Sequence, residues 1–104
     1  MKSQDILENQ AKIFFLGIGS NLGIRNRNIE KAKFLLVEHN LVVLSVSSYY
    51  DTPSCPDPRK PKFLNIILKL KCYYNPQELL KICKSIENQL GRKNAKKTLL
   101  VHVI

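Results

Sequence analysis

Acidic residues are scarce in this chain, and they stop early. The 104 residues contain 8 Asp and Glu against 17 Lys and Arg, a formal net charge of +9, and the last acid is Glu87. A basic surplus attracts polyanions such as nucleic acid, anionic membrane surfaces and nucleotides. Because the basic residues are spread along the chain, the pattern fits a solvated basic surface as well as a funnel for phosphate groups.

Long apolar runs and paired cysteines are also missing. No apolar run approaches the length of a membrane span, and the polar first ten residues, with acids at Asp5 and Glu8, are unlike a signal peptide. Cys55, Cys72 and Cys83 are odd in number and lack metal-type spacing, which favours free thiols in a reducing cytosol. We therefore expect a cytoplasmic protein without a membrane partner.

The length permits a single domain. We expect a polar tail at 1–11 and one domain at 12–104, present as a monomer.

Hydrophobic periodicity predicts an α+β fold. The predicted elements, in chain order, are a strand at 13–16, a glycine-rich turn at 17–23, a helix at 25–39, a strand at 41–50, a proline-rich loop at 51–61, a strand at 62–73 and a helix at 75–90. Asn75 and Glu78 predict a reciprocal cap at the start of the second helix, and Gly91 is expected just after its end. One further strand would complete a ferredoxin-like split βαβ arrangement, with both helices on one face of an antiparallel sheet.

The strand at 62–73 carries the candidate ligand residues. Phe63 and Asn65 fall on the same face of this strand, opposite Leu64 and Ile66. A side-chain amide both donates and accepts hydrogen bonds, which suits a heterocycle with amide-like edges, and an aromatic ring stacks on such a heterocycle. The alternative is that Phe63 belongs to the core and Asn65 is merely solvated.

Two other patterns have weaker functional readings. The turn at 17–23 lacks Gly-Lys-Ser/Thr, so it is no P-loop. Tyr49, Tyr50, Tyr73 and Tyr74 together with the basic charge are compatible with base stacking, but the chain has no RNA-recognition motif, and we do not expect a nucleic-acid partner.

Taken together and in order, several segments resemble a known family. They are Gly-Ile-Gly-Ser-Asn-Leu-Gly at 17–23, Ser-Ser-x-Tyr-x-Thr-Pro at 47–53, Phe-Leu-Asn at 63–65, Pro-x-Glu-Leu-Leu at 76–80 and Ile-Glu-x-x-Leu-Gly-Arg at 86–92. The combination resembles 2-amino-4-hydroxy-6-hydroxymethyldihydropteridine pyrophosphokinase of folate biosynthesis, from about Ile13 to Lys97. The resemblance implies transfer of pyrophosphate from ATP, with Mg²⁺, to the alcohol of 6-hydroxymethyl-7,8-dihydropterin.

The resemblance also implies roles for individual residues. The pterin pocket would be lined by Thr52, Pro53, Cys55, Phe63 and Asn65, with the ring of Phe63 stacking on the pterin and Asn65 bonding its edge. The ATP side would be formed by Lys84, Glu87 and Arg92.

The family pattern departs from this chain after Lys97. Relatives continue into a Pro-Arg-Thr-x-Asp-x-Asp segment, whose two acids bind magnesium and which forms the next strand, whereas this chain continues Thr-Leu-Leu-Val-His-Val-Ile at 98–104. We therefore expect a C-terminally truncated domain whose following strand is lost or replaced by residues 98–104. We expect that it retains no metal ligands and is inactive as a pyrophosphokinase.

A single-base frameshift after Lys97 is our hypothesis for this departure. If Thr98 to Ile104 are encoded ACG-CTC-CTC-GTA-CAT-GTG-ATA, one restored A gives AAC-GCT-CCT-CGT-ACA-TGT-GAT, which encodes Asn-Ala-Pro-Arg-Thr-Cys-Asp.

Two alternatives to the enzyme remain open: a non-catalytic binder of pterin or nucleotide, and a basic nucleic-acid-binding module of the same fold.

Overall fold

The computed structural model describes residues 10–53, 59, 61–91 and 99–104. Within these ranges the elements are β1 (Lys12–Ser20), α2 (Arg25–Glu38), β2 (Val42–Val46), β3 (Tyr50–Thr52), β4 (Phe63–Cys72), α3 (Pro76–Gly91) and β5 (Leu99–Val103). Most of the polar tail predicted at 1–11 lies outside the described residues. Neither described helix is long and apolar enough to cross a membrane.

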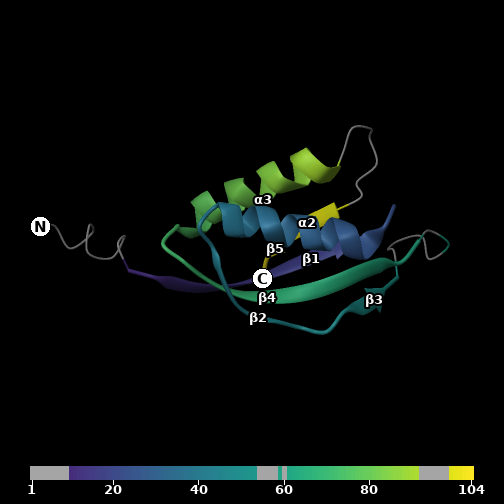
Figure 1. The fold of residues 1–104 in the computed structure, drawn as a ribbon, viewed down its shortest axis with the longest axis horizontal. Coiled ribbons are helices and arrows are strands. Elements are labelled where there is room, and N and C mark those ends of the chain that lie inside the picture. The colour runs from purple at the N-terminus through teal and green to yellow at the C-terminus, as the bar shows by residue number, and fades with distance from the viewer. Residues whose placement is uncertain (1–9, 54–58, 60, 92–98) are drawn as a thin grey trace, which may run out of the picture.

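The strands form one antiparallel sheet, and both helices cover the same face of it (Figure 1). The order across the sheet is β2-β4-β1-β5, and the short strand β3 pairs with β4 beyond the end of β2. This arrangement confirms the α+β prediction, and its order is that of a split βαβ fold.

The strand β5 is the replacement strand that the sequence left open as one alternative. Residues 99–103 pair antiparallel with β1 over Leu16 to Ser20. Val101 is buried and joins the core, so β5 closes the sheet next to β1 and contributes to the packing against the helices.

The prediction that Gly17 begins a turn is wrong. Gly17, Gly19 and Ser20 lie within β1 and pair in register with residues 64–67 of β4. The glycine-rich composition suggested a turn, but pairing with a long partner strand on one side and with β5 on the other holds these residues extended. Among the described residues of this segment, Gly23 alone has a left-handed backbone, with φ +71°.

The predicted strand at 41–50 is in fact two strands. The hydroxyl of Ser47 accepts a hydrogen bond from the amide of Ile67 at 2.8 Å, and the Ser47 amide donates to the Ile67 carbonyl at 2.9 Å. The Ser47 hydroxyl thus replaces a backbone carbonyl as the acceptor for the Ile67 amide, which interrupts the strand. The chain is again a strand, β3, from Tyr50 onward. The proline-rich loop consequently starts after Thr52, rather than at Asp51 as predicted.

The helix boundaries are set by local hydrogen bonds. Asn40, with φ +67°, ends α2 in a Schellman arrangement in which the Leu41 amide donates to the Leu36 carbonyl and the Asn40 amide to the Val37 carbonyl. At the start of α3, Asn75 and Glu78 exchange side-chain-to-backbone bonds of 2.8 and 2.9 Å, which confirms the predicted cap. Gly91 is the last helical residue rather than the one after it.

The core lies between the sheet and the two helices. The alternation predicted for β4 is confirmed, since Ile66, Leu68, Leu70 and Cys72 are buried whereas Lys69 and Lys71 are exposed. The rest of the buried apolar set comprises Leu16 and Ile18 of β1; Ile29, Ala32 and Leu36 of α2; Leu41, which precedes β2; Leu79, Cys83 and Ile86 of α3; and Val101 of β5. The helices leave the opposite face of the sheet uncovered (Figure 1). Because side chains alternate along a strand, Phe63, Asn65, Lys69 and Lys71 of β4 belong to that face.

Candidate functional site

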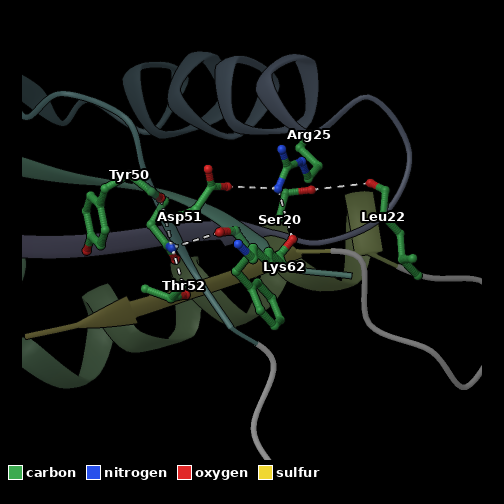
Figure 2. A network of polar contacts seen from close by, with 9 residues as sticks. Ser20, Leu22, Arg25, Tyr50, Asp51, Thr52 and Lys62 are labelled. Carbon is green, nitrogen blue, oxygen red and sulfur yellow. Dashed lines mark hydrogen bonds and ion pairs between the residues drawn. The ribbon is translucent and has the colours of Figure 1, made fainter. Parts of the chain in front are cut away.

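One end of the sheet gathers the described residues that the family resemblance assigned to a pterin. Register places Ser20, at the end of β1, opposite Leu64, and Thr52 of β3 opposite Phe63. The N-terminus of α2 reaches the same end through the turn that follows β1 (Figure 2). The start of β4 is therefore flanked by β1 on one side and by β3 on the other.

The side chain of Asn65 is at the centre of this end. Its amide nitrogen donates to the carbonyl of Tyr50 at 3.2 Å, to the hydroxyl of Thr52 at 3.0 Å and to the carbonyl of Phe63 at 3.2 Å. Two N–H bonds shared among three acceptors fix the plane of the amide. The alternative that Asn65 is merely solvated is therefore wrong, because the side chain joins β3 to β4.

Gly19 provides the space in which the Asn65 amide lies. A Cβ atom placed on Gly19 would come within 2.6 Å of Asn65 Oδ1 and 3.3 Å of Phe63 Cδ1. No real side chain is compatible with the first contact, so glycine is required for the amide and the ring to approach the strand this closely. Sequence reasoning missed this role, although a glycine inside a strand is a known sign of close backbone approach.

The other predicted pterin residues divide into those brought together and those not described. Thr52 and Phe63 are half-buried and both contact Asn65 through the bonds above. Pro53 follows directly after Thr52 and is exposed. Cys55 lies outside the described residues.

An arginine that the sequence did not single out connects this end to α2. One nitrogen of Arg25, Nη1, donates to Asp51 Oδ1 at 3.1 Å and to the carbonyl oxygen of Lys62 at 3.0 Å (Figure 2). Asp51 lies in β3, and Lys62 immediately precedes β4. The contact joins residues that are 26 and 37 positions apart, so no local pattern could reveal it.

Asn28 stabilises the turn between β1 and α2. Its amide nitrogen donates to Ser20 Oγ at 3.0 Å and to the Leu22 carbonyl at 2.9 Å. Ser20 is fully buried, and Asn21 Oδ1 is a buried oxygen without a hydrogen-bond partner among the described residues. Of the two polar residues of the glycine-rich segment, Ser20 thus helps to hold this turn, whereas the side-chain oxygen of Asn21 makes no such bond within the described part of the chain.

The residues predicted for the ATP side lie in the helical layer. Lys84 of α3 is exposed. The carboxylate of Glu87 accepts a hydrogen bond from the Val101 amide at 2.8 Å and so links α3 to β5. Burial, with a contribution from the Glu87 charge, raises the pKa of the Cys83 thiol to about 11. Arg92 lies outside the described residues.

A second polar cluster joins the β2–β3 connection to α2. The Tyr49 hydroxyl donates to Glu30 Oε2 at 2.7 Å, and Lys33 pairs with the same carboxylate. Burial and the bond to Glu30 raise the pKa of Tyr49 to about 12, whereas the bond from Tyr49 lowers the pKa of Glu30.

A separate groove of about 370 Å³ lies between the two helices. Phe34, Leu35 and Leu90 form its apolar lining, with Arg27 and Lys31 beside them. None of the described residues that were predicted to bind a ligand lines this groove, and the described residues of the predicted pterin pocket lie instead at the Asn65 end of the sheet.

The residues described at this site do not fit a magnesium ion. In the described ranges, no group of three or more His, Cys, Asp and Glu side chains gathers as a metal site would require. Glu87, the last acid of the sequence, is engaged with the backbone of β5.

Comparison with known proteins identifies a family whose model covers most of the described chain. The family model described as 7,8-dihydro-6-hydroxymethylpterin-pyrophosphokinase (HPPK) matches residues 15–103. This range contains Gly19, Arg25, Asp51 and the Phe63-x-Asn65 pair.

Individual relatives show the same affiliation. The 2-amino-4-hydroxy-6-hydroxymethyldihydropteridine pyrophosphokinase of Bacillus subtilis is 40% identical over 81 residues, covering 77% of this chain and 48% of the relative. The protein of the same name from Aquifex aeolicus is 39% identical over 79 residues, covering 76% and 49% of the two chains. The folic acid synthesis protein fol1 of Schizosaccharomyces pombe is 37% identical over 82 residues, 11% of its length. This chain thus spans about half the length of the two bacterial relatives, and it belongs to the 7,8-dihydro-6-hydroxymethylpterin-pyrophosphokinase family.

Proposed function

We propose that this chain carries the pterin-binding part of a pyrophosphokinase site, which in an intact site joins ATP to 6-hydroxymethyl-7,8-dihydropterin in folate biosynthesis. The observation that supports the proposal is the fixed amide of Asn65, which lies over Gly19 beside the ring of Phe63. Family membership supports pyrophosphate transfer as the reaction class.

The geometry of Asn65 indicates which half of the amide would contact a ligand. The amide nitrogen is committed to three protein acceptors, so the oxygen Oδ1 is the group that accepts a bond from the ligand. A pterin presents N–H donors along its lactam edge, which are complementary to such an oxygen. The ring of Phe63 offers a stacking surface, and Thr52, Pro53 and Cys55 complete the proposed pocket.

The proposed ATP side is formed by Lys84, Glu87 and Arg92, but we assign no catalytic step to them. Because the described residues do not fit Mg²⁺, and phosphoryl transfer depends on metal ions to neutralise the phosphates, we propose that the 104-residue chain alone has negligible turnover. The engagement of Glu87 with the Val101 amide favours the second candidate function, a non-catalytic pterin binder.

Calorimetric titration of the full chain with 6-hydroxymethyl-7,8-dihydropterin tests the proposal. We expect a saturable heat, a loss of about tenfold or more in affinity for Asn65→Ala, corresponding to about 1.4 kcal/mol, and unchanged affinity for Asn88→Ala, an exposed asparagine of α3. Absence of binding by the parent chain would overturn the pterin assignment. Salt-sensitive RNA binding in its place would favour the nucleic-acid-binding alternative.

A parallel assay for AMP release in the presence of ATP, Mg²⁺ and pterin separates binder from enzyme. We expect no AMP above the level without protein. Turnover at a rate normal for an enzyme, about 1 per second or faster, would contradict the proposed inactivity.

A further inference from the structure

We propose that Arg25 is a positioning residue for the pterin site, which acts by holding the strand β3 next to the start of β4. The inference rests on the proposed function, because it concerns the proposed pterin pocket beside Asn65. Arg25 itself would not touch the pterin; it acts through Asp51 and Lys62.

The contacts of Arg25 fall next to every acceptor that fixes Asn65. Asp51 lies between Tyr50 and Thr52, whose carbonyl and hydroxyl accept from the Asn65 amide. Lys62 directly precedes Phe63, whose carbonyl is the third acceptor. A single guanidinium nitrogen, bonded to both sides, therefore sets the separation between the end of β3 and the start of β4.

The place of Arg25 in the fold shows that it does not serve helix stability. It is the first residue of α2, where the helix dipole disfavours a cation, and the first turn of this helix contains no acid to compensate. The charge is instead compensated across the fold by Asp51. A residue that is unfavourable for its own helix but bonded to two other elements is explained by the connection it makes.

The strand β3 is the element that needs this connection. It has three residues, and among the strands of the described chain it pairs with β4 alone. Such a short strand frays readily, and fraying would release Tyr50 and Thr52 from Asn65. The Arg25 contact thus pre-organises the amide and the ring before ligand arrives, which lowers the ordering cost of binding.

Pterin titrations of Arg25→Gln and Asp51→Ala in the full chain test the inference, with Arg27→Gln as the matched control on the exposed side of the same helix. We expect each site variant to lose about tenfold in affinity, the size of one charge-assisted hydrogen bond. The double variant should lose no more than Arg25→Gln alone, because that substitution already removes both contacts of Arg25. Arg25→Lys, which retains the charge but replaces the planar guanidinium by a differently placed ammonium group, should fall in between. The control should bind like the parent.

Hydrogen exchange on the free chain distinguishes positioning from general destabilisation. In Arg25→Gln we expect faster exchange of the β3 amides. The backbone amides where β1 pairs with β4, such as those around the paired residues Leu16 and Leu68, should exchange at an unchanged rate. If the parent binds pterin and Arg25→Gln binds equally well, the inference is overturned while the proposed function stands. If the parent does not bind at all, the proposed function fails and the inference with it. Uniformly faster exchange throughout the core would reduce Arg25 to a structural role and overturn the inference.

Discussion

Replacing Gly19 by alanine should separate ligand affinity from stability. The new Cβ would lie 2.6 Å from Asn65 Oδ1, well below the 3.4 Å at which ordinary contact begins, and 3.3 Å from the Phe63 ring. The amide must move, and because its nitrogen is held by three acceptors, movement weakens at least one of those bonds. We expect the affinity for 6-hydroxymethyl-7,8-dihydropterin to fall by about tenfold or more, which corresponds to about 1.4 kcal/mol.

The stability of the same variant should change little. A weakened hydrogen bond costs about 0.5–1.5 kcal/mol, whereas alanine in place of glycine inside a strand contributes about 0.5–1 kcal/mol in the opposite sense. The two effects nearly cancel, so the unfolding midpoint should stay within about 4 °C of the parent, given that 1 kcal/mol shifts a domain of this size by about 4–8 °C. Calorimetric titration and thermal unfolding of the same preparation measure both quantities.

Gly23→Ala is the matched control with the opposite outcome. At φ +71° an added Cβ costs about 1–2 kcal/mol, but it would meet only the Asn28 amide nitrogen, at an ordinary 3.6 Å. We expect a lower unfolding midpoint with unchanged pterin affinity. Parent-like affinity in Gly19→Ala would refute the argument that Gly19 provides the space for the ligand-binding amide.

Three further predictions concern the remainder of the fold. Asn75→Ala removes one half of the α3 cap shared with Glu78, and urea unfolding should show a loss of about 1 kcal/mol. Tyr49 should titrate with a pKa of about 12 rather than 10.0, as monitored by tyrosinate absorbance against Tyr49→Phe. Because its pKa is raised in the folded state, the bond to Glu30 stabilises the fold fully below pH 10, and this contribution disappears as pH rises through 12. Titration of Tyr49 at pH 10 would contradict the contact. Cys83, with a pKa of about 11 and little exposure, should react with a disulfide reagent at pH 8 only after unfolding; rapid labelling of this thiol in the native chain would show that its burial is wrong.

The parts of the fold that depend on neighbours in sequence could be predicted. The reciprocal cap of Asn75 and Glu78, the apolar stripe of each helix and the two faces of β4 follow from spacing alone, because helix and strand periodicity decide which side chains share a surface. The same parity argument placed Phe63 and Asn65 on one face of the strand. The side-chain contacts that complete this face needed the structure.

The parts that depend on distant segments could not be predicted. Glycine content suggested a turn at Gly17, but pairing with β4 and β5 overrode this local preference. The break before β3 depends on the Ser47 hydroxyl bonding a strand 20 residues away. The contacts from Arg25 to Asp51 and from Glu87 to the Val101 amide join elements that are distant in the sequence. Because the sequence contains 17 basic residues, charge alone does not indicate which of them pairs with Asp51.

The most direct test of the central claim is an NMR titration of the ¹⁵N-labelled chain with 6-hydroxymethyl-7,8-dihydropterin. The claim is that pterin binds at the end of the sheet where Gly19, Thr52 and Asn65 meet. We predict saturable shifts for the side-chain amide of Asn65 and the backbone amides of Gly19 and Thr52, with the exposed amide of Asn88 unaffected. Absence of shifts, or shifts confined to the groove formed by Phe34 and Leu90, would contradict the account.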